Sequence, residues 1–233
     1  MHDEFSIERR SLLFLAPLAA AGLFARSTNA ATPTPGTLAW DDFIEAALSD
    51  ARSVYDANGY DEDYYLCRLA SDAIRLRSIP DEAKTFRFGK LDPPVEFGPA
   101  FRGSPFFVIQ WKLAPNAWLP PHNHPHYNVL TVGVEGEAVI THYEIEGEAP
   151  PFDSAAGFSV RRTRETLIAP RRLSPLTSTR DNIHTFRAGP KGARGVDITS
   201  RAGADMGFSF LDINEKASDA ARNVFGAKWR KLT

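Results

Sequence analysis

The feature that most constrains the fold is a series of short strand-forming segments that begins at about residue 84. Segments rich in β-branched and aromatic residues, such as FFVIQWKL (106–113) and ETLIAP (165–170), are separated by glycine, proline and asparagine. Short strands at this spacing are typical of a β-sandwich or β-barrel. We expect a barrel over residues 84–213, with 128–145 forming two strands joined at Glu135-Gly136.

The segments on both sides of this barrel are predicted to be helical. Residues 38–83 carry apolar side chains at helical spacing, which favours two helices, the second over about 61–77. Cys67, the only cysteine, lies near the apolar stripe of that second helix and is expected to be a small buried side chain. Residues 214–233 are predicted to form a short C-terminal helix.

The first thirty residues have the features of an export signal. Arg9-Arg10 precede an apolar stretch (12–25) and the small-residue pattern Thr28-Asn29-Ala30, and this arrangement resembles a twin-arginine signal. The apolar stretch is shorter than the roughly 20 residues of a membrane-spanning helix. We therefore expect an exported, periplasmic protein that leaves the membrane once residues 1–30 are removed, with 31–37 as a linker.

Composition limits the classes of partner. The chain of 233 residues has a formal net charge of −2, which argues against nucleic-acid binding because such proteins usually present a basic face. Five arginines gather in RRTRETLIAPRR (161–172), and we interpret them as a solvated face because the net charge stays balanced. A small-molecule ligand is the expected partner.

Three of the six histidines lie in PPHNHPHYN (120–128). Side chains alternate between the two faces of a strand, so His122 and His124 are predicted to point to one face and to converge on a metal. Pro125 interrupts the strand before His126, which is left either as a hydrogen-bond donor to substrate or as an exposed turn residue. Neutral imidazoles suit iron, zinc, copper and nickel.

This segment resembles the first motif of the cupins, in which two histidines precede a glutamate ligand and a glycine. His122, His124 and Gly136 match that motif, whereas Val129 occupies the position of the glutamate. The resemblance implies a double-stranded β-helix barrel and a third histidine ligand downstream. His184 in RDNIHTFRA corresponds to that ligand. The competing His142, in VITHYEI, matches no cupin ligand and is expected to be packed or on the surface.

Three histidines without a carboxylate are similar to the metal set of the thiol dioxygenases, including the plant cysteine oxidase, cysteamine dioxygenase and cysteine dioxygenase families. The likeness is carried by the HxHP segment, by Asn-Ile-His-x-Phe and by Asp197 on the next strand. It implies an iron(II) enzyme, with other divalent transition metals as alternatives, that oxidises a small thiol such as cysteine, cysteamine or mercaptopropionate to a sulfinate with O2. Arg102 and Asp197 are the candidates for binding substrate, Tyr143 for donating a hydroxyl and Asn128 for supporting the ligands from behind.

Two other functions fit the same residues. The three histidines serve equally well in an isomerase, a lyase or a different dioxygenase that uses zinc, manganese or nickel. The chain also fits a non-catalytic cupin that binds a metal or small molecule without turnover.

Overall fold

The computed structural model describes residues 34–55, 61–79, 95–201 and 209–230. The chain divides into residues 1–33 and 34–233, so all described residues belong to the second unit. The predicted export signal and residues 31–33 of the predicted linker lie outside the described residues. Within the described residues, no helix has both the length and the apolar character needed to cross a membrane.

Two helices precede the strands, at the positions that the apolar periodicity predicts. Helix α2 spans Trp40–Tyr55 and helix α3 spans Glu62–Arg75. Asp61 caps α3, because its carboxylate accepts a 2.9 Å hydrogen bond from the backbone N–H of Tyr64. Acidic residues in the first turn of each helix oppose the positive end of the helix dipole.

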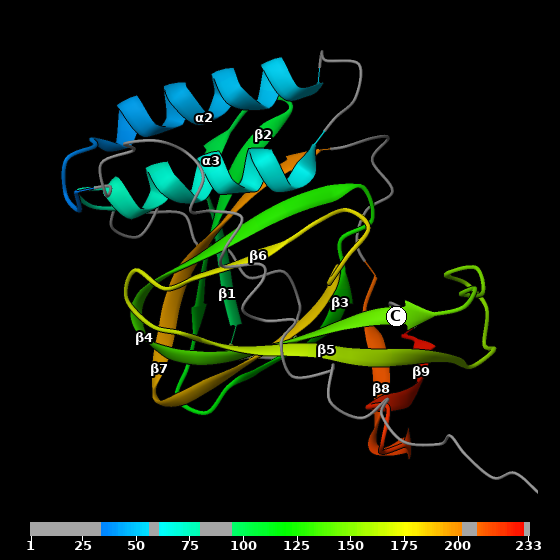
Figure 1. Ribbon diagram of the computed structural model, residues 1–233. Coiled ribbons are helices and arrows are strands. Elements are labelled where there is room, and N and C mark those ends of the chain that lie inside the picture. Colours follow the sequence, from blue (N-terminus) through cyan, green and yellow to red (C-terminus); the bar gives the residue numbers. More distant parts are fainter. Residues whose placement is uncertain (1–33, 56–60, 80–94, 202–208, 231–233) are drawn as a thin grey trace, which may run out of the picture. The chain divides into compact units, whose positions relative to one another are not determined.

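The remainder is a curled antiparallel β-sheet, shown from green to red in Figure 1. Its strands are β1 (Val95–Arg102), β2 (Phe106–Leu113), β3 (Trp118–Asn123), β4 (Tyr127–Glu146), β5 (Phe158–Ile168), β6 (Leu173–Leu176), β7 (Ile183–Arg201), β8 (Leu211–Asp219) and β9 (Val224–Trp229).

The two longest strands, β4 and β7, pair along nearly their full length, from Tyr127 opposite Arg201 to Tyr143 opposite Ile183. One half of this pair is extended by β2 and β6, and the other half by β3 and β5. The β4–β7 pair therefore belongs to two groups of strands and bends between them. A single β-bridge from His122 to Phe210 also links β3 to the residue that precedes β8.

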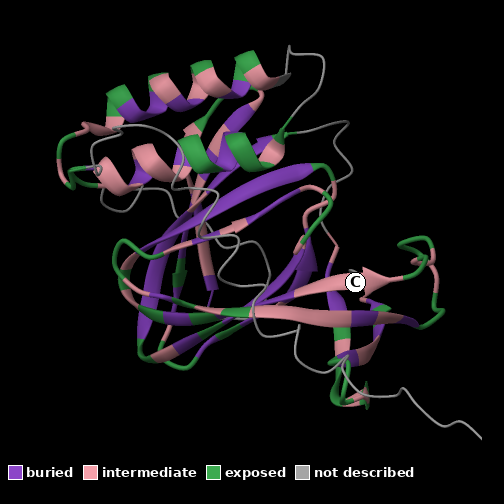
Figure 2. Ribbon diagram, in the orientation of Figure 1, coloured by how far each residue is buried: buried purple, intermediate pink, exposed green. Residues whose placement is uncertain are grey.

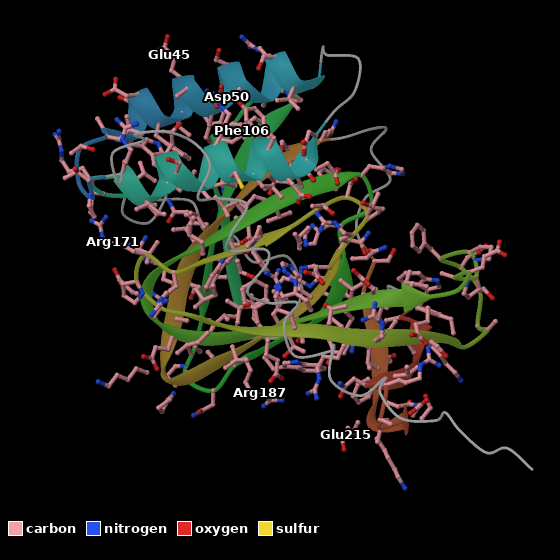
Figure 3. The ribbon with its side chains drawn as sticks, in the orientation of Figure 1. Glu45, Asp50, Phe106, Arg171, Arg187 and Glu215 are labelled. Atoms are coloured by element: carbon pink, nitrogen blue, oxygen red, sulfur yellow. The ribbon has the colours of Figure 1, made fainter. Side chains whose placement is uncertain are left out.

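Apolar side chains occupy both faces of this sheet. On the outer face, Phe106, Leu130 and Ile198 pack with the apolar residues of α2 and α3. Figure 3 places Phe106 beside the two helices. On the inner face, Trp111 and Phe186 belong to a second cluster that includes residues from β1 to β5 and β7. The burial colours of Figure 2 follow this arrangement, with purple on the curled strands and green on the outward faces of the helices.

The predicted C-terminal helix is wrong, because residues 211–229 form the hairpin β8–β9. Asn223 takes a left-handed conformation (φ 56°) at the turn, and β9 then pairs with β5. Val224, Ala227 and Trp229 are buried there. The alanines, glutamate and lysine of this segment favour a helix, but pairing with β5 and burial of alternate side chains outweigh that propensity.

Two further expectations need correction. Residues 128–145 are not two strands, because β4 continues through Gly136 with register shifts on either side of it. Cys67 is exposed, since the buried face of α3 is formed by Tyr65, Leu66, Leu69 and Ala73.

Gly136 is a position in β4 where an added side chain would collide with the neighbouring backbone. Its φ is +63°, and an added Cβ would lie 2.1 Å from the carbonyl oxygen of Gly192 on β7. We expect Gly136→Ala to lower the free energy of unfolding by more than about 2 kcal/mol. Gly147→Ala is the matched control, because Gly147 has φ +79° but open space around it, and it should cost only about 1 kcal/mol. If the two variants lose the same free energy of unfolding, measured with urea, the contact with Gly192 is unimportant.

Candidate metal centre

Strand register brings four polar side chains into one row across the sheet. His184 on β7 lies opposite His122 on β3 and, on its other side, opposite His142 on β4. His142 in turn lies opposite Arg164 on β5. Directly opposed residues of antiparallel strands point to the same face, and the period of two adds His124 to that face.

The three predicted ligands, His122, His124 and His184, come together and offer ligand atoms within 4.8 Å of one another. The Nε2 atom of His184 lies 3.0 Å from Nε2 of His122 and 3.0 Å from Nε2 of His124. Two ligands at right angles, each about 2.1 Å from a metal, are about 3.0 Å apart. The two separations therefore fit a site in which His122, His124 and His184 would hold one metal ion.

Hydrogen bonds between the rings cannot account for all the close nitrogen–nitrogen contacts in this cluster. Nδ1 of His122 lies 2.9 Å from the carbonyl oxygen of Pro120, which only accepts, so Nδ1 carries the proton and Nε2 presents a lone pair. A single nitrogen, Nε2 of His184, faces both other rings and can satisfy only one of those contacts. Lone pairs that face one another at this distance are stabilised by a cation.

Burial keeps the rings neutral and therefore ready to bind a metal. His184 is fully buried, His122 is nearly so and His124 is partly exposed. Loss of hydration lowers the pKa of His122 to about 4. It lowers the pKa values of His124 and His184 well below the usual range, and repulsion from the neighbouring rings adds to the effect. Metal binding at neutral pH therefore does not require these rings to lose a proton.

His142 is buried beside the cluster, but both its ring nitrogens are engaged. Nδ1 lies 3.2 Å from the carbonyl oxygen of Asp181, whereas Nε2 lies 3.2 Å from Nη2 of Arg164 and 2.8 Å from Oγ of Ser174. Arg164 only donates, so Nε2 accepts and Nδ1 carries the proton. This supports the expectation that His142 is a packed residue. Sequence reasoning missed Arg164, whose inward direction follows only from the strand register.

Asp197 lies on β7, the same strand as His184 and not the next one as expected, because this strand continues from Ile183 to Arg201. It is connected to the histidines through aromatic rings. Its Oδ1 accepts hydrogen bonds from Trp111 Nε1 (3.1 Å) and Thr131 Oγ1 (2.7 Å). The ring of Trp111 contacts Phe186, and Phe186 contacts His184. The apolar surroundings raise the pKa of Asp197 to about 6, against the effect of these two donors. Oδ2 makes no hydrogen bond to a described residue, which leaves it available to a ligand.

The other predicted site residues lie elsewhere. Arg102 is exposed at the end of β1, opposite Phe107, and His126 is exposed in the turn after His124. Tyr143 packs in the apolar cluster beside β9, where its ring contacts Phe225, so the structure does not bring it to the histidines. Asn128 is buried and accepts a hydrogen bond from the backbone N–H of Ser178.

Comparison with known proteins gives structural neighbours alone. No protein-family model matches the chain, and no curated protein matches its sequence. Similar solved structures include KdgF from Halomonas sp. (15% identity, 55% of this chain and 98% of that chain, TM-score 0.38). They also include the cupin domain of Cnp3 from Schizosaccharomyces pombe (12%, 46% and 64%, 0.35) and an uncharacterized Klebsiella pneumoniae protein with a double-stranded β-helix domain (16%, 55% and 92%, 0.37). The fold described above rests on the strand register of this chain.

Removal of His184 should abolish tight metal binding, whereas removal of His142 should not. We expect His184→Ala to weaken binding of Co(II) more than about 100-fold, because it removes the ring that faces both other ligands. His142→Gln should change the affinity less than about tenfold, because it alters only packing behind His184. Titration followed by visible absorption of Co(II) measures both. Unimpaired binding by His184→Ala would exclude His184 from the ligand set.

Stability of the metal-free protein should fall on acidification. Burial, with repulsion from Arg164, lowers the pKa of His142 from 6.5 to about 4, so between these values the unfolded chain binds a proton that the folded chain does not. The contribution of His142 to the free energy of unfolding is fully present above pH 6.5. It is lost as pH falls toward 4, by about 1.4 kcal/mol per pH unit at most. In chelator-treated protein, the free energy of unfolding measured with urea should fall less steeply with decreasing pH in His142→Gln than in the unaltered protein. An unchanged slope would show that His142 does not titrate in this way.

Proposed function

We propose that the protein is a metal-dependent enzyme that oxidises a small thiol with O2, in the manner of the thiol dioxygenases. The observation that carries this proposal is a set of three neutral imidazoles, two of them buried, with no carboxylate among them. His122, His124 and His184 would hold iron(II), although the same donors also accept other divalent ions. Bound iron(II) would supply the redox chemistry that transfers both atoms of O2 to the thiol sulfur and gives a sulfinate.

The neutrality of the ligand set selects the substrate. Because the three imidazoles contribute no negative charge, the site keeps the whole charge of a divalent ion, and an anionic thiolate is the ligand that balances it best. Partial exposure of His124 leaves this member of the set accessible to small molecules. Apolar neighbours such as Phe186 and Phe210, whose rings contact the histidines, limit access of water to the rest of the set.

Asp197 would orient the substrate by accepting a hydrogen bond from its amine. Two donors fix Oδ1, so Oδ2 is presented in a defined direction. With a pKa of about 6, Asp197 is ionised at neutral pH and can pair with an ammonium group. Amino thiols such as cysteamine or cysteine are therefore the substrate class that we favour. Arg102, exposed at the end of β1, remains the candidate for a substrate carboxylate.

The proposal includes export by a twin-arginine route, on the basis of residues 1–30. That route moves folded proteins, so the histidines would acquire their metal before transport. A thiol of the cell envelope would then be the substrate.

An oxygen-electrode assay of iron-loaded protein tests the proposal. Cysteamine, cysteine and 3-mercaptopropionate are supplied separately, and the sulfinate is identified by mass spectrometry. We expect Asp197→Asn to lower kcat/KM for cysteamine roughly 10–100-fold, the effect of a lost hydrogen bond between charged groups, and to change 3-mercaptopropionate little. Absence of oxygen uptake with all three thiols would overturn the proposal and favour a different metal-dependent reaction or a binding role.

A further inference from the structure

A cavity of about 380 Å³ lies between helix α3 and strands β4, β5 and β6. Its volume is in the range that holds small organic molecules. Most of its wall is apolar, and this wall includes Leu66 and Ala70 of α3, Leu130 of β4, and Leu173 and Leu176 of β6. Such a wall suits a hydrocarbon chain.

Charged side chains line the rest of the cavity, and its two carboxylates are already engaged. Asp63 pairs with the guanidinium of Arg180. Asp181 accepts a hydrogen bond from Thr163, and its Oδ2 lies 3.3 Å from Nε of Arg164. Neither carboxylate is therefore a free site for a cationic ligand.

Arg164, in contrast, has donors to spare. Its Nη2 donates to the carbonyl oxygen of Pro175 and to Nε2 of His142. Its buried Nε makes no hydrogen bond despite the nearby Asp181, and Nη1 makes none to a described residue. Burial lowers the pKa of Arg164, and the charge of Arg180 acts in the same direction against that of Asp181. An additional anion beside the guanidinium would relieve this cost.

We propose that this cavity binds a small aliphatic carboxylate, with its chain against the leucines of α3, β4 and β6 and its carboxylate accepting hydrogen bonds from Arg164. The cavity lies outside the three-histidine set, so the ligand is a second molecule and not the thiol. Its apolar wall and the unused donors of one guanidinium define its chemistry.

Occupation of the cavity would also act on the metal centre, a step that rests on the proposed function. Arg164 contacts His142, and the ring of His142 lies 5.8 Å from that of His184, centroid to centroid. The positive charge of Arg164 opposes a cation at the three histidines, and a carboxylate beside Arg164 would offset it. Metal affinity should therefore rise when the carboxylate binds, and by linkage the carboxylate should bind more tightly to the metal-loaded protein.

Cys67 gives a direct measurement, because it is the only cysteine of the chain and lies in the cavity wall. Burial and the nearby Asp63 raise the pKa of this thiol, so its reaction with a chromogenic disulfide is followed at pH 8.5. Hexanoate is the probe and 1-hexanol its uncharged control. We expect hexanoate to slow the reaction saturably, with a Kd at least about tenfold below that of hexanol, as expected for a charged hydrogen bond.

Two variants and one control refine this test. Ala70→Trp should fill the cavity, so that hexanoate no longer slows the reaction of Cys67. In Arg164→Gln, hexanoate should slow this reaction no more strongly than hexanol does. Arg187→Gln is the control, since Arg187 is exposed at the lower edge of the curled sheet in Figure 3, does not line the cavity and should leave protection unchanged. Because hexanoate and hexanol are compared on the unaltered protein, the test does not depend on whether a variant folds.

The outcomes separate this inference from the proposed function. Hexanoate that fails to slow the reaction of Cys67 overturns the cavity as a binding site, and equal protection by hexanol overturns recognition of a carboxylate. For the coupling, saturating hexanoate should raise the Co(II) affinity about threefold or more. An unchanged affinity overturns the coupling. If hexanoate protects Cys67 in a protein that binds no metal, the carboxylate site stands and the proposed enzyme function fails.

Discussion

The pairing of β4 with β7 is the constraint on which the site depends. Its register sets His184 between His122 and His142, and a slip of one residue would turn His184 to the outer face. The inner apolar cluster opposes such a slip, because Phe186, two residues along β7, would leave it together with His184. His122 and His184 are therefore fixed by the same packing that stabilises the sheet, whereas His124 follows the last residue of β3.

The same row explains why His142 is not a member of the cluster formed by His122, His124 and His184. Arg164 lies opposite His142 and donates to its Nε2, which uses the lone pair that a metal would need. The guanidinium can only donate in this hydrogen bond, because it has no lone pair with which to accept one. His142 thus fills space behind His184 as a neutral ring. Distance and protonation therefore agree, because His142 also lies outside the group of three histidines whose ligand atoms are within 4.8 Å of one another.

Sequence reasoning succeeded where one local period controls the structure and failed where distant pairing does. The helical period gave α2 and α3, and the period of two placed His122 and His124 on one face. The composition of the hairpin β8–β9 favours a helix, and only the pairing of β9 with β5 makes this segment extended. Arg164 was interpreted as part of a solvated face, because its contact with His142 depends on the β4–β5 register. For the same reason, no local pattern revealed the pairing of His142 with Arg164.

Val129 shows how a single apolar residue shapes the chemistry open to this protein. It is fully buried and packs with Tyr127 and Leu176, so the position could not hold an ionised carboxylate without a cation beside it. With valine there, the ligand set of His122, His124 and His184 stays neutral, and a divalent ion would keep its full charge. Asp197, a carboxylate on that inner face, accepts hydrogen bonds from Trp111 and Thr131, and the rings of Trp111 and Phe186 connect it to His184. In the proposed function, a bound anion would then balance the charge of the ion, so the charge of the substrate would select it more strongly than its shape.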